Sequence, residues 1–300
     1  MTDSQQLYTT PEAARRAVTD KLRAESEIRP WSLADLQRQY AYDQLVERLY
    51  RTDEKWVIKG ATALLARRIA VRHTIDIDVY HAGAIMDVER QLREAVQLDI
   101  GDWMRFEVGP SVAVQAAGAQ ASRVKVRSVI GTKVWAAFQI DIVADGILLS
   151  EAPDLVAPLT SVTAIKQERR PWRAYPLVDH VADKVCAILE RHGGRPSTRY
   201  KDLIDLVAVA ERGTVVAEAQ IRALRKEGAR RSLELPSDFD VPDRRLWAAG
   251  YRAEARRAVE LPALELEEAL RVVKPLVDPV LDGSATGVWN AGRGVWSPTA

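Results

Sequence analysis

The sequence predicts an α+β protein in which a sheet domain with helices is followed by a mainly helical domain. Segments of helical and strand patterning alternate up to about residue 150, as in domains built on a sheet. Beyond about residue 160 the strand patterning fades and helical patterning continues. Apolar residues make up 47% of the 300 residues, which is enough to bury a core.

Two amphipathic helices are predicted at the N-terminal end. Residues 11–28 have Thr10 as a candidate N-cap and Pro11 at the first helical position, where proline is favoured. Residues 32–50 follow a second candidate cap, Ser32. We expect both helices to pack on the sheet domain.

The strands of the sheet domain are predicted from short apolar or alternating runs. Residues 56–58 form an apolar run that ends at a glycine turn and a helix, and residues 74–80 alternate strictly. Residues 122–130 and 134–143 are expected to form two strands joined by a tight turn. Further helices are expected at residues 85–98, 177–192, 199–212, 215–227 and 251–274.

These elements define three expected regions: N-terminal helices at 1–44, a sheet domain at 45–158 and a mainly helical domain at 159–300. The tail from residue 282 is rich in glycine, serine and threonine, and we expect an irregular segment held by Trp289 and Trp296.

The alternating strand at 74–80 carries two aspartates, Asp76 and Asp78, on one face. Ile75, Ile77 and Val79 would then face a core. Aspartate is disfavoured in strands, and two like charges on one face repel unless a cation intervenes. The pattern therefore predicts a magnesium site; the alternative is an exposed face with two solvated aspartates.

A third carboxylate, Asp141, lies between isoleucines in the strand at 134–143. If that strand pairs beside 74–80, Asp141 joins Asp76 and Asp78, and three carboxylates suit metal-assisted phosphoryl transfer. The alternative is an aspartate that merely ends a hairpin strand. The turn at Lys59-Gly60 opens a helix, and the N–H groups of a helix N-terminus attract phosphate.

A lysine, Lys184, falls within the apolar face of the helix at 177–192. A buried lysine requires a paired charge or a bound anion, whereas a lysine at the rim of the stripe would reach solvent. In the following helix Asp202 lies at the edge of the core face and is expected to act as a base or to orient Lys184. Asp205 points farther away and is expected to be solvated or a structural partner.

The bulk composition limits the classes of function. A net charge of +1 does not by itself indicate a nucleic-acid partner, which would need a local basic face. The single cysteine, Cys186, excludes a disulfide framework and a cysteine-based zinc site, and it favours a reducing cytoplasm. Residues 1–10 lack the apolar segment of a signal peptide, and no apolar run is long enough to span a membrane.

Three segments share a high density of basic residues. They are Arg123, Lys125 and Arg127 on one predicted strand, residues 167–173 with Trp172, and the cluster Arg225, Lys226, Arg230 and Arg231. Arginine beside tryptophan suits phosphate contact and base stacking. Together with Arg191, Arg195 and Arg199, these segments are hypothesised to form a positive channel, which requires a contiguous positive path to Asp76.

The run from Lys59 to Val79, which contains KGATAL and RHTIDID, resembles the first motif of the AbiEii/AbiGii-type toxins. These toxins look like members of the polymerase-beta-like nucleotidyltransferase superfamily. The resemblance continues at Asp141 and over residues 183–206, where Lys201 stands in place of a common arginine. A second departure is Gly60-Ala61, where two glycines are frequent.

The resemblance implies a Mg²⁺-dependent nucleotidyltransferase, with Mn²⁺ as the alternative metal, whose helical domain completes the active-site cleft. It implies transfer of a nucleotide from an NTP, with CTP or UTP favoured, to the 3′ end of tRNA, which blocks translation. A cognate antitoxin is the implied partner, no membrane is involved and the cytoplasm is the implied location. The residues expected to bind the nucleotide are Lys59, Gly60, Ala61, Arg72, Thr74 and Lys184.

Two other classes of function stay open from the sequence. The nucleotide acceptor is a protein or a small molecule in one of them. In the other the chain is a non-catalytic regulator that binds a nucleotide or an antitoxin. Three carboxylates on neighbouring strands favour the enzyme, because a binding module has no need of them.

Overall fold

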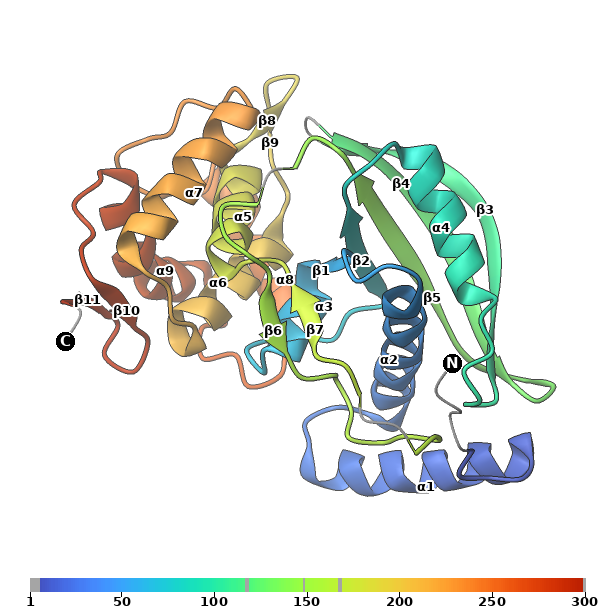
Figure 1. Ribbon diagram of the computed structural model, residues 1–300. Helices are drawn as coiled ribbons and strands as arrows, with labels where there is room; N and C mark the ends of the chain where they lie inside the picture. The colour runs from blue at the N-terminus through green and yellow to red at the C-terminus, as the bar shows by residue number, and fades with distance from the viewer. Residues whose placement is uncertain (1–5, 117–118, 148, 167–168, 299–300) are drawn as a thin grey trace. The chain divides into compact units, whose positions relative to one another are not determined.

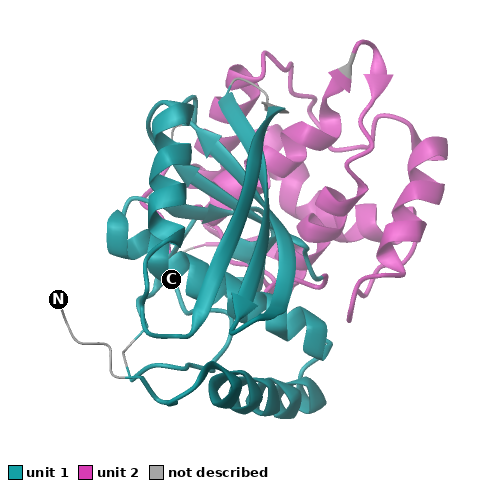
Figure 2. Ribbon diagram, turned by 90° about the vertical axis from the view of Figure 1, so that its right-hand side faces the viewer, with its two compact units in different colours: residues 1–66, 73–147, 155–174 teal, residues 67–72, 148–154, 175–300 magenta. Residues whose placement is uncertain are grey.

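The computed structural model describes residues 6–116, 119–147, 149–166 and 169–298. The chain divides into two compact units, shown in teal and magenta in Figure 2. The sheet unit comprises residues 1–66, 73–147 and 155–174, and the helical unit comprises residues 67–72, 148–154 and 175–300. The predicted α+β fold class is confirmed.

The described part of the sheet unit contains one seven-stranded sheet in the order β3-β4-β5-β2-β1-β7-β6. β2 is parallel to β5 and antiparallel to β1, while β3, β4 and β5 form a long antiparallel meander (Figure 1). The strands are β1 (Val57–Lys59), β2 (Asp76–His81), β3 (Met104–Ala116), β4 (Ala119–Ile130), β5 (Lys133–Ala144), β6 (Asp154–Val156) and β7 (Trp172–Ala174).

The hairpin predicted at residues 122–143 is confirmed as β4 and β5, but β3 was not predicted. β3 contains Gly109-Pro110, which interrupt the alternation, and the pairing with β4 shifts its register between Val108 and Ser111. Proline cannot donate to a ladder and is tolerated at a bulge. The strand therefore continues through residues that are typical of a turn.

The helices of this unit are α1 (Pro11–Ile28), α2 (Leu33–Thr52), α3 (Gly60–Ala66) and α4 (Ile85–Val96). Thr10 and Ser32 cap α1 and α2 as predicted, because each hydroxyl accepts a backbone N–H of the first turn at 3.2 Å. α2 and α4 contact β5 and cover one face of the sheet. Residues that alternate with the buried ones, such as Asp78, Asp141 and Arg123, lie on the opposite face.

The helical unit is built on α5 (Leu177–Leu189) and α6 (Tyr200–Arg212), which pack against each other. It also contains α7 (Ala217–Arg230), α8 (Arg244–Ala255), α9 (Leu266–Leu281) and the short strands β8 (Arg191–His192) and β9 (Arg195–Pro196). The single helix predicted at 251–274 is wrong. Pro262 disfavours helix at the preceding residue, and Glu265 then caps α9 through a capping box with Glu268.

The C-terminal tail is held by its tryptophans, as predicted. Trp289 is 1% exposed, its ring nitrogen donates to the Ala210 carbonyl at 2.9 Å, and its ring lies 5.6 Å from that of Trp296. The tail is not wholly irregular, because β10 (Val288–Asn290) pairs with β11 (Val295–Ser297). Among the described residues, no helix is both long and apolar enough to cross a membrane.

Candidate functional site

β2 places Asp76 and Asp78 on the face of the sheet that α2 and α4 leave uncovered. Ile77 and Val79 are fully buried on the other face, so the two half-buried aspartates point together. Ile75 is 51% exposed, and the expectation that it faces a core is wrong. The strand begins at Asp76, one residue after it.

The register across four strands sets four charged residues opposite one another. Lys59 on β1 faces Asp78 on β2, Asp78 faces Asp141 on β5, and Asp141 faces Arg123 on β4. Directly opposite residues share a face of the sheet. We call these four residues the charged row; the predicted pairing of the Asp141 strand beside the aspartate strand is confirmed.

Arg123 holds Asp141 through two hydrogen bonds, from Nε at 2.6 Å and from Nη2 at 2.7 Å. This hydrogen bonding raises the pKa of Arg123 above its ordinary value against some opposing burial, and the charges of Asp141, Asp76 and Asp78 add to it. Arg123 therefore stays charged beside the carboxylates. In the sequence Arg123 is one of three alternating cations. Its place opposite Asp141 depends on the register between β4 and β5.

Gly60 allows the backbone to lie directly against Asp78. Its φ is +58°, and a Cβ added there would lie only 1.7 Å from Asp78 Oδ2. No other residue fits this approach without moving the carboxylate. Ala61, the departure from the two-glycine pattern, is buried in α3.

Two threonines fix the start of β2. The hydroxyls of Thr62 and Thr74 each donate to the Asp76 carbonyl at 3.1 Å, and the Asp76 N–H donates back to Thr74 Oγ1 at 3.2 Å. Thr62 is fully buried in α3. The described contacts of Thr74 thus position Asp76, and Thr74 itself precedes the strand.

The carboxylates of this face are suitable ligands for a hard divalent cation. Asp76 and Asp78 offer oxygen atoms on one side of one strand, and magnesium is typically held by one or two carboxylates together with substrate phosphates. Within the described residues no group of three or more histidine, cysteine or acidic side chains is gathered as a metal cluster. Asp141, the expected third ligand, has both oxygens on Arg123, so it would join the pair only by leaving that arginine.

The helical unit contains a second charged group, which we call the lysine cluster. Lys184 on α5 donates to Asp202 at 2.8 Å and to Asp205 at 2.7 Å, both on α6. Arg72 holds Asp205 through two bonds of 2.8 and 2.7 Å, and Arg199 donates to Asp202 at 2.5 Å. Three cations therefore surround two carboxylates.

Burial and charge fix the ionisation of the lysine cluster. Burial disfavours the ammonium of Lys184, but the charges of Asp202 and Asp205 outweigh it and raise the pKa of Lys184 above its ordinary value. Burial likewise disfavours the carboxylate of Asp205, yet Arg72 and Lys184 hold the pKa of Asp205 well below its usual range. Both groups are therefore charged at neutral pH.

The alternative that Asp205 is solvated is wrong, because its side chain is 0% exposed; it is a structural partner of Lys184. Its angle on the helix wheel indicated an exposed side chain, but Arg72, from a distant part of the sequence, pairs with it on that side of α6. Arg72, which was expected to bind the nucleotide or hold the turn, has Asp205 as its described partner. Lys184 is not a rim lysine, since only 6% of its side chain is exposed.

Two other buried groups of the helical unit supply neither a thiolate nor a positive charge. Burial raises the pKa of the Cys186 thiol to about 12, so the thiolate is not available. Burial, followed by the charge of Lys184, holds the pKa of His180 well below its ordinary value. His180 is therefore neutral and cannot contribute a positive charge.

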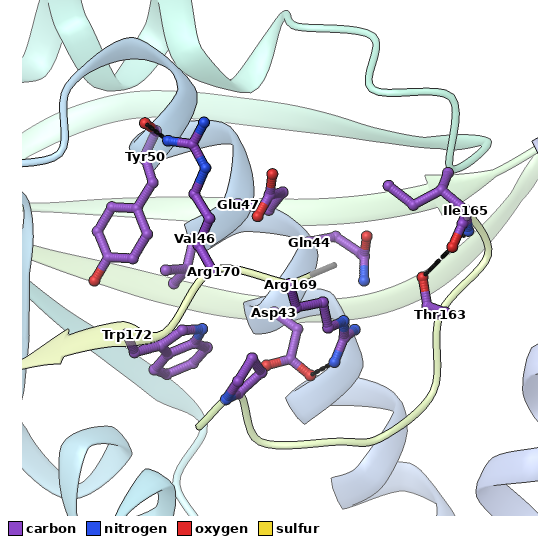
Figure 3. A pocket seen from close by; sticks show the side chains of 11 residues that line it. Asp43, Gln44, Val46, Glu47, Tyr50, Thr163, Ile165, Arg169, Arg170 and Trp172 are labelled. Atoms are coloured by element: carbon purple, nitrogen blue, oxygen red, sulfur yellow. Dashed lines mark hydrogen bonds and ion pairs between the residues drawn. The ribbon is translucent and has the colours of Figure 1, made fainter. Parts of the chain in front are cut away.

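In the basic segment at residues 169–173, Arg169, Arg170 and Trp172 line a small pocket of the sheet unit (Figure 3). Arg169 donates to Asp43 at 3.2 Å, and Arg170 donates to the Tyr50 carbonyl at 2.9 Å. Trp172 is 2% exposed, so its ring cannot stack on a base, and that interpretation is wrong. Residues 167–168 of the same segment lie outside the described residues.

Comparison with known proteins assigns the family. The sequence profile described as "Nucleotidyl transferase AbiEii toxin, Type IV TA system" matches residues 44–272. No curated protein matches the sequence.

Among solved structures, the chain is similar to MenT4, a nucleotidyltransferase toxin from Mycobacterium tuberculosis H37Rv, with 17% identity over 83% of this chain and 76% of that one, at a TM-score of 0.47. It is also similar to JHP933 from Helicobacter pylori, with 15% identity over 84% and 94% of the two chains and a TM-score of 0.49. A putative nucleotidyltransferase from H. pylori matches with 16% identity over 85% and 97%, at a TM-score of 0.47. From the profile match over residues 44–272, the chain belongs to the AbiEii nucleotidyltransferase toxin family of type IV toxin–antitoxin systems.

Proposed function

We propose that this toxin transfers a nucleoside monophosphate, with a pyrimidine favoured, from an NTP to the 3′ end of tRNA and thereby blocks translation. The observation that carries the proposal is the pair Asp76 and Asp78, which share one face of β2 with the Gly60 backbone against Asp78. An acidic pair on one face of a strand suits the metal-assisted transfer of a phosphoryl group.

In the proposed reaction the 3′ hydroxyl oxygen attacks the α-phosphorus of the NTP, and the bond from that phosphorus to the α–β bridging oxygen breaks. Pyrophosphate leaves, and the hydroxyl proton passes to a neighbouring carboxylate. Negative charge develops on the phosphate oxygens during this step, so cations that are already in place lower its barrier.

The residues of the sheet unit take the metal-binding part. Asp76 and Asp78 would hold Mg²⁺, or Mn²⁺ as the alternative, with Asp141 joining once it leaves Arg123. When bound, the cation neutralises charge on the transferring phosphates. Lys59, directly opposite Asp78, is proposed to contact the nucleotide, together with the turn at Gly60-Ala61.

The lysine cluster is proposed to supply positive charge in addition to the metal. Transfer is proposed to need the aspartate pair and the lysine cluster. Lys184 is held as an ammonium by Asp202 and Asp205. The oxygens of Asp202 accept from Lys184 and Arg199, which supports a positioning role for Asp202 over a role as the base. A cognate antitoxin and a cytoplasmic location are part of the same proposal.

The test is an incubation of the purified protein with total tRNA, Mg²⁺ and each NTP in turn, labelled at the α-phosphate and resolved on a denaturing gel. The proposal expects label in a tRNA-sized band with CTP or UTP, and none from the same NTP labelled at the γ-phosphate. Label on protein would show that the acceptor is a protein and not tRNA. No incorporation from any NTP, with nucleotide binding retained, would favour the non-catalytic regulator.

A further inference from the structure

The exposed face of β4 carries a line of three cations, Arg123, Lys125 and Arg127, which we call the basic stripe. The residues between them, Val124 and Val126, are 1% and 2% exposed, so the alternation fixes which face the cations occupy. All three cations are exposed. β4 lies between β3 and β5 in the meander (Figure 1).

The register connects the basic stripe to the aspartates of β2. Lys125 faces Gln139 on β5, and Gln139 faces Asp76. Arg123 reaches Asp78 in the same way through Asp141. Strands lie about 4.8 Å apart, so the stripe runs roughly 10 Å from the aspartates and on the same face of the sheet.

The spacing and surroundings of the stripe suit an extended polyanion. Alternate residues of a strand are ~6.7 Å apart, which is comparable to the separation of consecutive phosphates in a single nucleic-acid strand. The partners of Lys125 and Arg127 on β5 are Gln139 and Ala137, which carry no charge that would repel a phosphate. A positive groove that follows the backbone is the usual way to hold a single strand.

Some cations of the other basic segments form ion pairs within their own unit. Arg169 pairs with Asp43 in the sheet unit. In the helical unit Arg230 and Arg231 share Glu227 at 2.5 and 2.6 Å. Among the described cations of these segments, those of the basic stripe combine exposure with a register connection to Asp76.

A second ion pair on the stripe, besides that of Arg123 with Asp141, competes with a phosphate. Arg127 donates to Glu107 on β3 at 2.5 Å, with side chains 62% and 52% exposed. Exposed ion pairs contribute little to stability, so the guanidinium can exchange this carboxylate for a phosphate. Glu107 should therefore weaken polyanion binding in the native protein.

We infer that the basic stripe holds the sugar–phosphate backbone of the acceptor nucleic acid and leads its 3′ end toward Asp76 and Asp78. The inference rests on the proposed function and adds to it the surface that recognises the acceptor. Arg123 belongs to the charged row as well, so Lys125 and Arg127 are the residues that test the stripe without touching the carboxylates.

The experiment measures the binding of a short fluorescein-labelled single-stranded RNA to the full chain by fluorescence anisotropy, without NTP, over a series of salt concentrations. The test variants are Lys125→Gln and Arg127→Gln. The matched controls are Lys21→Gln on α1, an exposed lysine, and Arg90→Gln on α4, an arginine that also has carboxylate partners. Glu107→Gln adds a change of opposite sign.

Lys125→Gln and Arg127→Gln are expected to weaken RNA binding several-fold, with the slope of log affinity against log salt reduced by about one in each. Glu107→Gln is expected to strengthen binding, and both controls are expected to match the parent protein. Wild-type binding by both stripe variants would overturn the inference, and so would equal losses in the controls.

The transfer assay keeps this result separate from the proposed function. Loss of RNA binding in the stripe variants supports the stripe even if no NTP yields a transferred nucleotide. Transfer that persists with an unchanged KM for tRNA in both variants would refute the inference about the stripe and would leave the proposed function in place. A KM that rises for tRNA but not for the NTP supports both.

Discussion

Replacing Gly60 by alanine tests the close approach between the α3 turn and Asp78. At φ +58° a side chain strains the backbone, and the new Cβ would lie 1.7 Å from Asp78 Oδ2. The left-handed conformation costs roughly 1–2 kcal/mol, and forcing an atom into a filled space costs roughly another 1–3 kcal/mol. We therefore expect Gly60→Ala to lower the free energy of unfolding by about 2–5 kcal/mol.

The matched control is Gly193→Ala. Gly193 has the same φ of +58°, but nothing lies within 4 Å of the position of its Cβ. Its substitution should cost only the backbone strain, roughly 1–2 kcal/mol. Urea unfolding of both variants isolates the contact with Asp78, and Mn²⁺ titration followed by electron paramagnetic resonance reports whether Asp78 has moved.

We expect Gly60→Ala to bind Mn²⁺ more weakly than both the parent and Gly193→Ala, because the carboxylate is displaced. Equal destabilisation of the two variants, with Mn²⁺ affinity unchanged in both, would refute the reasoning that Gly60 positions Asp78.

Three further predictions concern the aspartate pair of β2 and the lysine cluster. Asp76→Ala and Asp78→Ala should each abolish nucleotide transfer with a nearly unchanged unfolding curve, and activity retained in both would contradict their role. Lys184→Met removes one partner from a buried ion network and should cost about 3–5 kcal/mol in urea unfolding, while a loss below about 1 kcal/mol would show that the cluster is solvated. The depressed pKa of Asp205 contributes stability that is fully present above the ordinary aspartate value of about 3.9 and is lost as the pH falls toward the lower folded value. The difference in unfolding free energy between the parent and Asp205→Asn should therefore be constant above about pH 4 and shrink below it; a constant difference down to pH 2 would be inconsistent with a depressed pKa.

The local elements of the fold can be predicted from the sequence. Capping residues, the alternation around Asp76 and Asp78, and the hairpin before Asp141 are written in neighbouring residues, and the structure confirms them. Prediction from local patterns failed in two places, both at residues that usually interrupt a strand or a helix. Gly109-Pro110 conceal the strand pattern of β3, and Pro262 lies in the break between α8 and α9 that the apolar pattern does not show.

The partners of the site residues cannot be predicted from the sequence, because they depend on strand register and on contacts between distant segments. Arg123 meets Asp141 across a strand pair, and Arg72 meets Asp205 over 133 residues of chain. A helix wheel places Asp205 away from the core of its own helix and does not show what packs there from elsewhere. The ion pairs of Asp205 with Arg72 and Lys184 therefore bury a side chain that its own helix would leave exposed.

The measurement that tests the account most directly is transfer from α-labelled CTP and UTP to tRNA whose 3′ end is either intact or oxidised with periodate, by the parent protein and by Asp78→Asn. We predict label on intact tRNA with the parent protein, none on oxidised tRNA, and none with the variant. Equal label with Asp78→Asn, or label on the oxidised tRNA, would contradict the claim that the aspartate pair of β2 directs a nucleotide to a 3′ hydroxyl.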